Sequence, residues 1–387
     1  MKRFLGALSL TLMLVSGVGA EEDLATKQAG FACDLYLRAA SKPGNLFFSP
    51  WSVSTALAMT SAGARGTTAE EMLKTLHYSD DSVHSALGAQ IKDLEKPTSG
   101  YQLSVANRIW PNAGLSLQPS FETLLRTSYG ATVQALNFDE SARQVINQWV
   151  ATQTQDKIQD LLPSGAVSSA TQMVLTNAIY FKGTWKVAFD PKNTSTRSEF
   201  HVRSGPPVVT PMMCLTDSFR HATVGDVEIL ELPYTGERLS MILLLPTEAD
   251  GLPALEAKLS AVQLEKWLAP LESSKMRCSI PRFRLTWEAS LSAILQSLGM
   301  RKAFGAGADF SGMGGTPGAI FLSEVFHKAF VEVNEAGTEA AAATAVLMTR
   351  SMASPDQFIA DHPFLFLIRD SQNGTILFMG RLEDPTK

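Results

Sequence analysis

The chain has 387 residues, of which 45% are hydrophobic, and its formal net charge at pH 7 is -5. This composition is sufficient for a large hydrophobic core in one or two domains and gives no sign of disorder. The acidic balance argues against a general nucleic-acid role, because binding to a phosphate backbone depends on clustered Lys and Arg.

The first twenty residues have the pattern of a secretory signal peptide. Lys2 and Arg3 precede an apolar run from Phe4 to Val15, and small residues precede the polar segment that begins at Glu21. The apolar run is shorter than the roughly 18 to 20 residues that a membrane-spanning helix needs. We therefore expect residues 1–20 to be removed and residues 21–387 to be secreted, or periplasmic in a Gram-negative host, without membrane association.

The cysteines and possible modification sites are few. Cys33, Cys214 and Cys278 lie far apart without metal-ligand spacing, so we expect three free thiols, at most one disulfide, and no metal or cofactor. The segments 193–195 and 373–375 fit the N-glycosylation pattern, which matters only in a host that glycosylates.

The first half of the chain predicts mainly helices. Apolar residues at helical spacing predict an amphipathic helix from Leu24 to about Ala40, and the almost uncharged run 51–63 predicts a buried helix. Thr67-Thr-Ala-Glu70 fits a capping box that would begin a helix ending at Leu76. The other predicted elements are strands at 45–50, 103–110, 132–138 and 171–181 and helices at 118–128 and 141–162. The strand at 171–181 is apolar throughout, which predicts burial on both faces.

The second half predicts mainly strands. These strands are expected at 208–213, 227–232, 239–245, 277–285, about 320–333, 364–368 and 375–379, with hairpin turns at 235–238 and at Asn373-Gly374. Single helices are expected within 252–270 and at 288–298. Helices come first and strands later, with no repeat or linker, so the sequence predicts one α+β domain.

No catalytic motif is present. The chain lacks a Gly-x-Ser-x-Gly elbow, a His-Glu-x-x-His pair and a phosphate-binding Gly-x-x-x-x-Gly-Lys loop. His327 alone among six histidines lies within an apolar strand, where a hydrogen-bonded structural role is more common than catalysis. We expect that the protein is not an enzyme.

The segment from Val331 to Asp361 does not fit an ordinary domain. Its alanine run favours a short helix by propensity, because alanine has the best helix propensity. The same residues also alternate like a strand, with Thr338, Ala340, Ala342 and Thr344 on one face and Glu339 on the other. Both interpretations remain open from the residues alone.

Three segments together resemble the serpins. These are NLFFSPWSVSTALAMTSAGARGTT at 45–68, TQMVLTNAIYF with KGTW at 171–185, and EAGTEAAAAT at 335–344. The resemblance covers almost all of residues 21–387. It implies a serpin-like α+β domain with a large central mixed β-sheet, further sheets, about eight to nine helices and an exposed reactive-centre loop at about 335–361.

The resemblance also implies a mechanism and its residues. A serine protease cuts the loop, and the freed loop enters the central sheet as a strand with the protease attached. Gly337 is the expected pivot, and Thr338 is the expected first inward side chain to enter. The implied hinge residues are Glu335, Gly337, Thr338, Glu339, Ala340, Ala341, Ala342, Ala343 and Thr344. The implied shutter consists of Asn177 and His327 on neighbouring central strands and of Ser49 and Ser52 at the buried helix behind them. Trp185 marks the breach where the loop first enters. Ala336 departs from the charged residue that the family often has there.

Two positions for the cleaved bond remain open. A position thirteen residues after Gly337 gives Arg350-Ser351, which a trypsin-like protease would select through its acidic specificity pocket. A position fourteen residues after Gly337 gives Ser351-Met352 and an elastase-like or subtilisin-like target. We favour Arg350 because it is an isolated basic residue in a neutral segment. A non-inhibitory serpin acting as carrier or chaperone is the remaining alternative.

Further partners are not indicated. The segment 80–97 has two lysines against four acidic residues, so we expect no heparin-type site. The expected partner is the target protease, and the expected state is a monomer.

Overall fold

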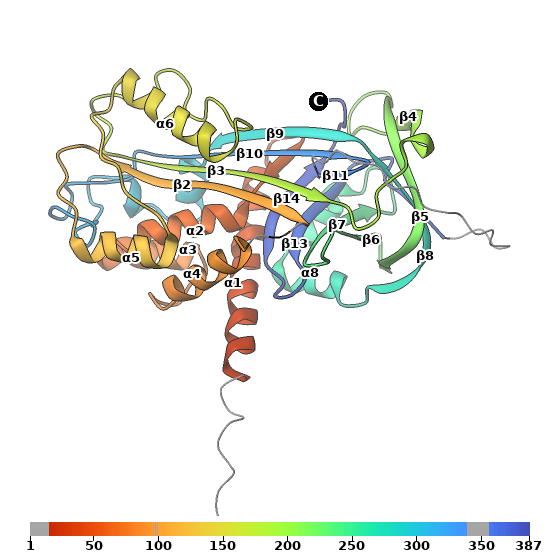
Figure 1. Cartoon of the computed structure of the whole chain (residues 1–387), viewed down its shortest axis with the longest axis horizontal. Coiled ribbons are helices and arrows are strands. Elements are labelled where there is room, and N and C mark those ends of the chain that lie inside the picture. Colours follow the sequence, from red (N-terminus) through yellow and green to blue (C-terminus); the bar gives the residue numbers. More distant parts are fainter. Residues whose placement is uncertain (1–14, 97, 99, 339–355) are drawn as a thin grey trace, which may run out of the picture.

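The computed structural model describes residues 15–338, except 97 and 99, and residues 356–387, with side chains described from Leu24 onward. Within these ranges the chain forms two β-sheets and a group of helices (Figure 1). The reactive-bond candidates Arg350 and Ser351, and the hinge residues from Glu339 to Thr344, lie outside the described residues.

The central sheet is mixed, as expected. Its strands follow the order β2 (Tyr101–Pro111), β3 (Met173–Thr184), β11 (Gly337–Thr338), β10 (Glu324–Asn334) and β9 (Phe283–Ser290). β3 pairs with β10 in parallel, and the remaining pairs are antiparallel.

The second sheet contains most of the strands expected in the second half of the chain. Its order is β1-β14-β13-β7-β6-β5-β8-β12, and β4 pairs with β5 beside this path. The bounds are β1 (Leu46–Phe48), β4 (Ser195–Phe200), β5 (Val208–Val224), β6 (Val227–Pro233), β7 (Leu239–Pro246), β8 (Glu272–Pro281), β12 (Asp356–Ile359), β13 (Phe364–Asp370) and β14 (Ile376–Leu382). The hairpins β6–β7 and β13–β14 confirm both predicted turns.

Nine α-helices occur in the described residues, in agreement with the expected eight to nine. They are α1 (Val15–Ala39), α2 (Pro50–Ser61), α3 (Gly66–Thr75), α4 (Val83–Leu94), α5 (Pro119–Tyr129), α6 (Glu140–Gln153), α7 (Leu252–Lys258), α8 (Ala261–Leu268) and α9 (Ser292–Ser297). Figure 1 shows α6 on one face of the central sheet and α2 to α5 on the opposite side. α1 begins before the expected Leu24 and continues through the predicted cleavage position after Ala20.

Both faces of the central sheet are covered. One hydrophobic cluster joins the sheets to the helices around α2, whose residues are all buried. A second cluster packs α6, through Ile146 and Val150, against Ala178 of β3 and Phe330 of β10. This double burial explains why β3 is mainly apolar from Met173 to Phe181.

Two predictions in the first half were wrong at their boundaries. α3 begins at Gly66, with Arg65 at the N-cap position and no side-chain cap, so Thr67 lies inside the helix and the predicted capping box is absent. The predicted strand at 132–138 is reduced to a single bridge at Leu136, since only this residue has a strand neighbour.

Three predicted helices were also too long. The helix expected over 141–162 ends at Gln153, because the Thr154 hydroxyl accepts from the Ile158 N–H and Gln155 has a left-handed φ of 52°. The helix expected within 252–270 is divided into α7 and α8 at Ser260, which caps α8. Residues 288–290 of the helix expected at 288–298 belong to strand β9 instead, where they pair with β10.

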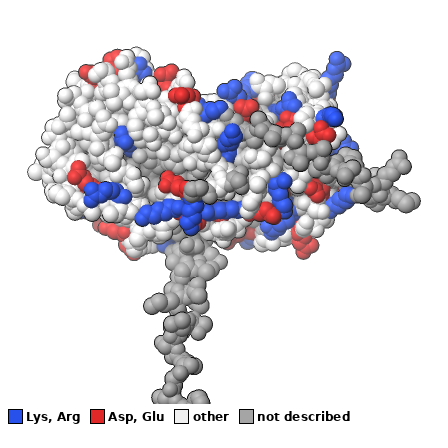
Figure 2. Space-filling model, viewed as in Figure 1, with Lys and Arg blue, Asp and Glu red and all other residues white. Residues whose placement is uncertain are grey.

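The described residues show mixed surface charge (Figure 2), no candidate membrane span and no candidate metal site. Figure 2 shows Lys and Arg interspersed with Asp and Glu on one face of the molecule. Within the described residues, no helix has the length and hydropathy of a membrane span, and no group of three metal-binding side chains occurs. Cys33, Cys214 and Cys278 are free thiols, as expected.

Candidate functional site at the opening of the central sheet

The two middle strands of the central sheet separate at one end. β3 and β10 pair directly from Val174 and Glu324 as far as Tyr180 and Phe330. Beyond this point β11 lies between them, in antiparallel register with both strands. The sheet therefore already accepts the beginning of an additional strand at this end.

Thr338 is already inside the sheet. It pairs with Gly183 on one side and Val333 on the other, and its side chain is fully buried. Its hydroxyl lies 2.7 Å from the hydroxyl of Tyr234. In this state Thr338 therefore already occupies the place of the first inward side chain of an additional strand.

Gly337 is required by the geometry of the hinge. Its φ of 152° is one that residues with a side chain rarely adopt, and a Cβ at this position would lie 2.0 Å from the Gly183 carbonyl oxygen. The pivot that the sequence suggested is thus a position where only glycine fits without movement of β3.

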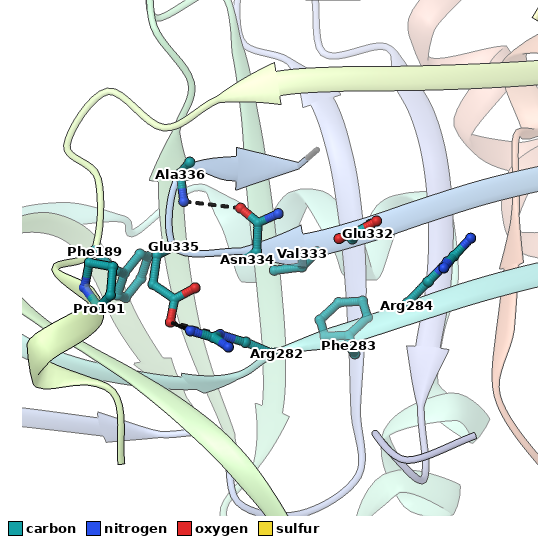
Figure 3. Close-up of a pocket in the computed structure, with 10 residues that line it drawn as sticks. All are labelled: Phe189, Pro191, Arg282, Phe283, Arg284, Glu332, Val333, Asn334, Glu335 and Ala336. Atoms are coloured by element: carbon teal, nitrogen blue, oxygen red, sulfur yellow. Dashed lines mark hydrogen bonds and ion pairs between the residues drawn. The ribbon is translucent and has the colours of Figure 1, made fainter. Parts of the chain in front are cut away.

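Glu335 anchors the turn before β11. Its side chain accepts hydrogen bonds from the Arg282 guanidinium, with 2.7 Å to Nε (Figure 3). The side chain also accepts from the Thr194 hydroxyl, and the Glu335 carbonyl accepts from the Phe189 N–H. Burial alone would raise the pKa of Glu335, but its hydrogen bonds with Arg282 and Thr194 outweigh burial, and the pKa is lowered. Glu335 is therefore held as a carboxylate beside a cleft of about 560 Å³.

Trp185, at the other side of the opening, binds the turn between β10 and β11 through two hydrogen bonds. Its indole N–H donates to the Asn334 carbonyl at 3.0 Å, and its backbone N–H donates to the Ala336 carbonyl at 3.1 Å. Its ring stacks on Tyr234 with centroids 4.7 Å apart. The predicted breach tryptophan thus contacts the turn that joins β10 to β11.

The four predicted shutter residues meet where the start of α2 packs against β3 and β10. The Ser49 N–H donates to Nε2 of His327 at 3.2 Å, while Nδ1 of His327 contacts the amide oxygen of Asn177. The Asn177 amide donates to the Ser52 hydroxyl at 2.7 Å, and the Ser52 N–H donates to the Ser49 hydroxyl at 3.1 Å. All four side chains are buried, so the network joins α2 to both strands.

His327 is uncharged in this network. Its Nε2 accepts a hydrogen bond, so the ring proton resides on Nδ1 and is donated to Asn177. Burial lowers the pKa of His327 to about 3. The hydrogen bonds of His327 with Ser49 and Asn177 give it a structural role, because they join α2 to β10 and β3.

Four residues of this site were not predicted from the sequence. Asn107 of β2 joins the shutter, since its amide oxygen accepts from Ser52 at 3.2 Å and also from Asn177. Arg282, Thr194 and Tyr234 contact the hinge from other parts of the chain. No local motif marks these residues, because each of them lies at least 53 positions from its partner.

The fold and site define a class of protein whose central sheet is open at one end for a strand that follows β10. A family model described as "Serpin (serine protease inhibitor)" matches residues 26–385. The chain belongs to the serpin family. This membership confirms the expectations of a serpin fold and of a protease-inhibitor family rather than an enzyme family.

Individual relatives agree with this assignment. The chain is 41% identical over 380 residues to the human leukocyte elastase inhibitor, covering 94% of this chain and 100% of the relative. The crystal structure of Serpin48 from the insect Tenebrio molitor superposes with a TM-score of 0.84 at 33% identity, covering 95% of this chain and 98% of the other. Human thyroxine-binding globulin complexed with thyroxine superposes with a TM-score of 0.87 at 29% identity, covering 95% and 100% of the two chains.

Proposed function

We propose that this serpin is a suicide substrate that traps a serine protease by inserting its cleaved loop between β3 and β10. The protease serine oxygen attacks the scissile carbonyl carbon, the peptide C–N bond breaks, and the departing amine takes a proton. The loop then remains attached to the protease as an ester. Insertion displaces this ester from the catalytic groups, whose geometry tolerates errors of only about 1 Å, so hydrolysis stops.

The observation that carries this proposal is the position of β11. This strand is antiparallel to β3 and β10 and already occupies the first two places of an additional strand. In the same register, each further loop residue would pair with the residue one position earlier in β3 and one position earlier in β10. Residues 337–348 would then lie opposite the whole of β3, Met173–Thr184, which gives a full-length strand.

The same register brings the loop to the shutter. Thr344 would lie between Asn177 and His327, which now face each other directly. Insertion must therefore separate this pair. The inserting strand must also pass beneath α6, which covers the outer face of the sheet. We propose that the shutter opposes insertion before cleavage, and that Glu335 to Thr344 form the hinge and the first part of the inserting strand.

The target is a serine protease, and two observations bear on its specificity. Arg350 favours a trypsin-like enzyme that cuts Arg350-Ser351. The relative named leukocyte elastase inhibitor favours the second candidate, an elastase-like enzyme that cuts Ser351-Met352. Mixing the protein with trypsin and with elastase distinguishes them on denaturing gels, because only a trapped ester gives a larger band. We expect the band with trypsin; a band with elastase alone favours the second bond.

Cleavage without any larger band would contradict the inhibitory proposal. It would favour a carrier function, as in the relative that is complexed with thyroxine. Sequencing the loop fragments from the same gels locates the cut at Arg350 or at Ser351.

We also propose that residues 1–20 are a signal peptide and that the protein is secreted. The pattern of Lys2, Arg3 and the following apolar run supports this, and the family match begins only at residue 26. The measurement is the N-terminal sequence of the protein recovered outside the cytoplasm, which should begin at Glu21. A recovered N-terminus at Met1 would contradict cleavage.

A matched pair of substitutions tests insertion itself. In the register of β11, Ala340 would lie between Phe181 and Val331, which are both fully buried. Ala340→Arg should place an unpaired charge in the core and prevent insertion, because such burial is heavily penalised. The variant should be cut at a nearly normal rate but should no longer trap the protease.

The control is Glu339→Arg, one residue earlier. Glu339 would lie between Lys182 and Glu332, which are only half-buried, so an arginine there keeps access to water. We expect much less loss of trapping. Equal loss in both variants would contradict the alternating insertion of the loop.

A further inference from the structure

Tyr234 occupies a fixed position at the opening of the central sheet. It follows β6 directly and is fully buried. Its backbone N–H donates to the Leu239 carbonyl at 2.9 Å, so the β6–β7 hairpin holds the residue in place. Its ring stacks on Trp185 with an interplanar angle of 8° and meets Phe181 edge to face at 5.1 Å. The ring therefore has little freedom to move.

The hydroxyl of this rigid ring points to one residue of the loop. It lies 2.7 Å from the Thr338 hydroxyl, and both side chains are buried. If β11 left the sheet, the Tyr234 hydroxyl would lose this hydrogen-bond partner. The contact therefore favours the inserted position of Thr338.

The alanine run after Thr338 cannot define its own register. Ala340, Ala341, Ala342 and Ala343 have identical side chains, and an inserting strand could shift by two residues without changing its pattern. A shift by two would place Ala336 or Ala340 beside Tyr234, and neither residue has a hydroxyl. Only the observed register pairs the two hydroxyl groups.

We propose that Tyr234 is a positioning residue that sets the register in which the loop enters the central sheet, by holding the Thr338 hydroxyl level with Gly183 and Val333. This inference rests on the proposed insertion mechanism. A strand that starts in register extends along β3 without a search, whereas a shifted strand must leave and begin again. Removing the hydroxyl contact should therefore slow productive insertion, and hydrolysis of the ester should compete better.

The experiment compares Tyr234→Phe, which keeps the ring, with Thr338→Val, which keeps the shape of the side chain. Each removes one hydroxyl. We expect either variant to be cut at the wild-type rate while the ratio of cleaved to trapped molecules rises about fivefold, the factor that corresponds to one typical hydrogen bond. Thr338→Ser keeps a hydroxyl and should restore the wild-type ratio.

Two further comparisons separate positioning from general stability. The double variant should be no worse than either single variant, since both remove the same contact. Tyr129→Phe removes another buried phenol hydroxyl, which lies 2.6 Å from His84 and far from the opening, and should leave the ratio unchanged. Additive effects of the two single variants, or a wild-type ratio in Tyr234→Phe, would overturn the proposal.

Hydrogen exchange in the uncut protein tests the contact independently of trapping. The amides of Gly337 and Thr338 should exchange about fivefold faster in Tyr234→Phe than in the wild type, because β11 is held less firmly. Unchanged exchange would overturn the role of Tyr234. Failure of the wild type to trap any protease, with faster exchange in the variant, would instead contradict the proposed inhibitory function.

Discussion

Acidification should weaken this fold through His327, and the structure determines the size of the effect. Nε2 of His327 accepts the Ser49 N–H at 3.2 Å, so a proton added there would face another proton in a buried site. Burial lowers the pKa of His327 from 6.5 to about 3. The unfolded chain therefore binds this proton at a higher pH than the folded chain.

The sign and magnitude follow from this difference in pKa. The stability contributed by neutral His327 is fully present above pH 6.5 and is lost progressively as the pH falls toward 3. Each pH unit in this interval costs about 1.4 kcal/mol from one such group, so acidification to pH 5 should cost about 2 kcal/mol.

The assay is unfolding of the uncut protein in urea at a series of pH values, for wild type and for His327→Gln. Glutamine does not titrate, so the variant should be less stable at pH 7.5 but should lose about 2 kcal/mol less on acidification to pH 5. His201→Gln, at an exposed histidine, is the control and should follow the wild type. Parallel curves for wild type and His327→Gln would refute the assignment of a neutral buried imidazole.

Three further results are expected. Proteolytic nicking of the loop should raise the midpoint of thermal unfolding by tens of degrees, since the freed strand completes the central sheet; a midpoint at or below that of uncut protein would contradict insertion. Gly337→Ala should detach β11 and reduce protease trapping, because its Cβ would collide with the Gly183 carbonyl, whereas Gly44→Ala, also at positive φ but in open space, should not alter trapping. Asn107→Leu should lower the free energy of unfolding by about 1–3 kcal/mol by removing the buried amide oxygen that accepts from Ser52 and Asn177, and an unchanged urea midpoint would argue against its place in the shutter.

Local patterns in the sequence determined the elements that depend on their own residues. The uncharged run after Pro50 became the buried helix α2, and the apolar run before Thr184 became the doubly covered strand β3. The hairpin turn at Gly374 was predictable because its φ of 84° requires glycine or a similar residue. The motifs around Ser49, Asn177 and Glu335 were sufficient to indicate the family.

Contacts between distant residues were decided only by the tertiary structure. Tyr234 and Thr338 are separated by 104 positions, and Arg282 and Glu335 by 53, so no local pattern relates them. The strand expected at 132–138 is absent for the same reason. A strand needs a pairing partner, and local sequence does not determine which segment lies beside it. The sequence predicted that the residues from Thr338 onward alternate as in a strand. The pairing of Thr338 with Gly183 and Val333 depends on where β3 and β10 separate.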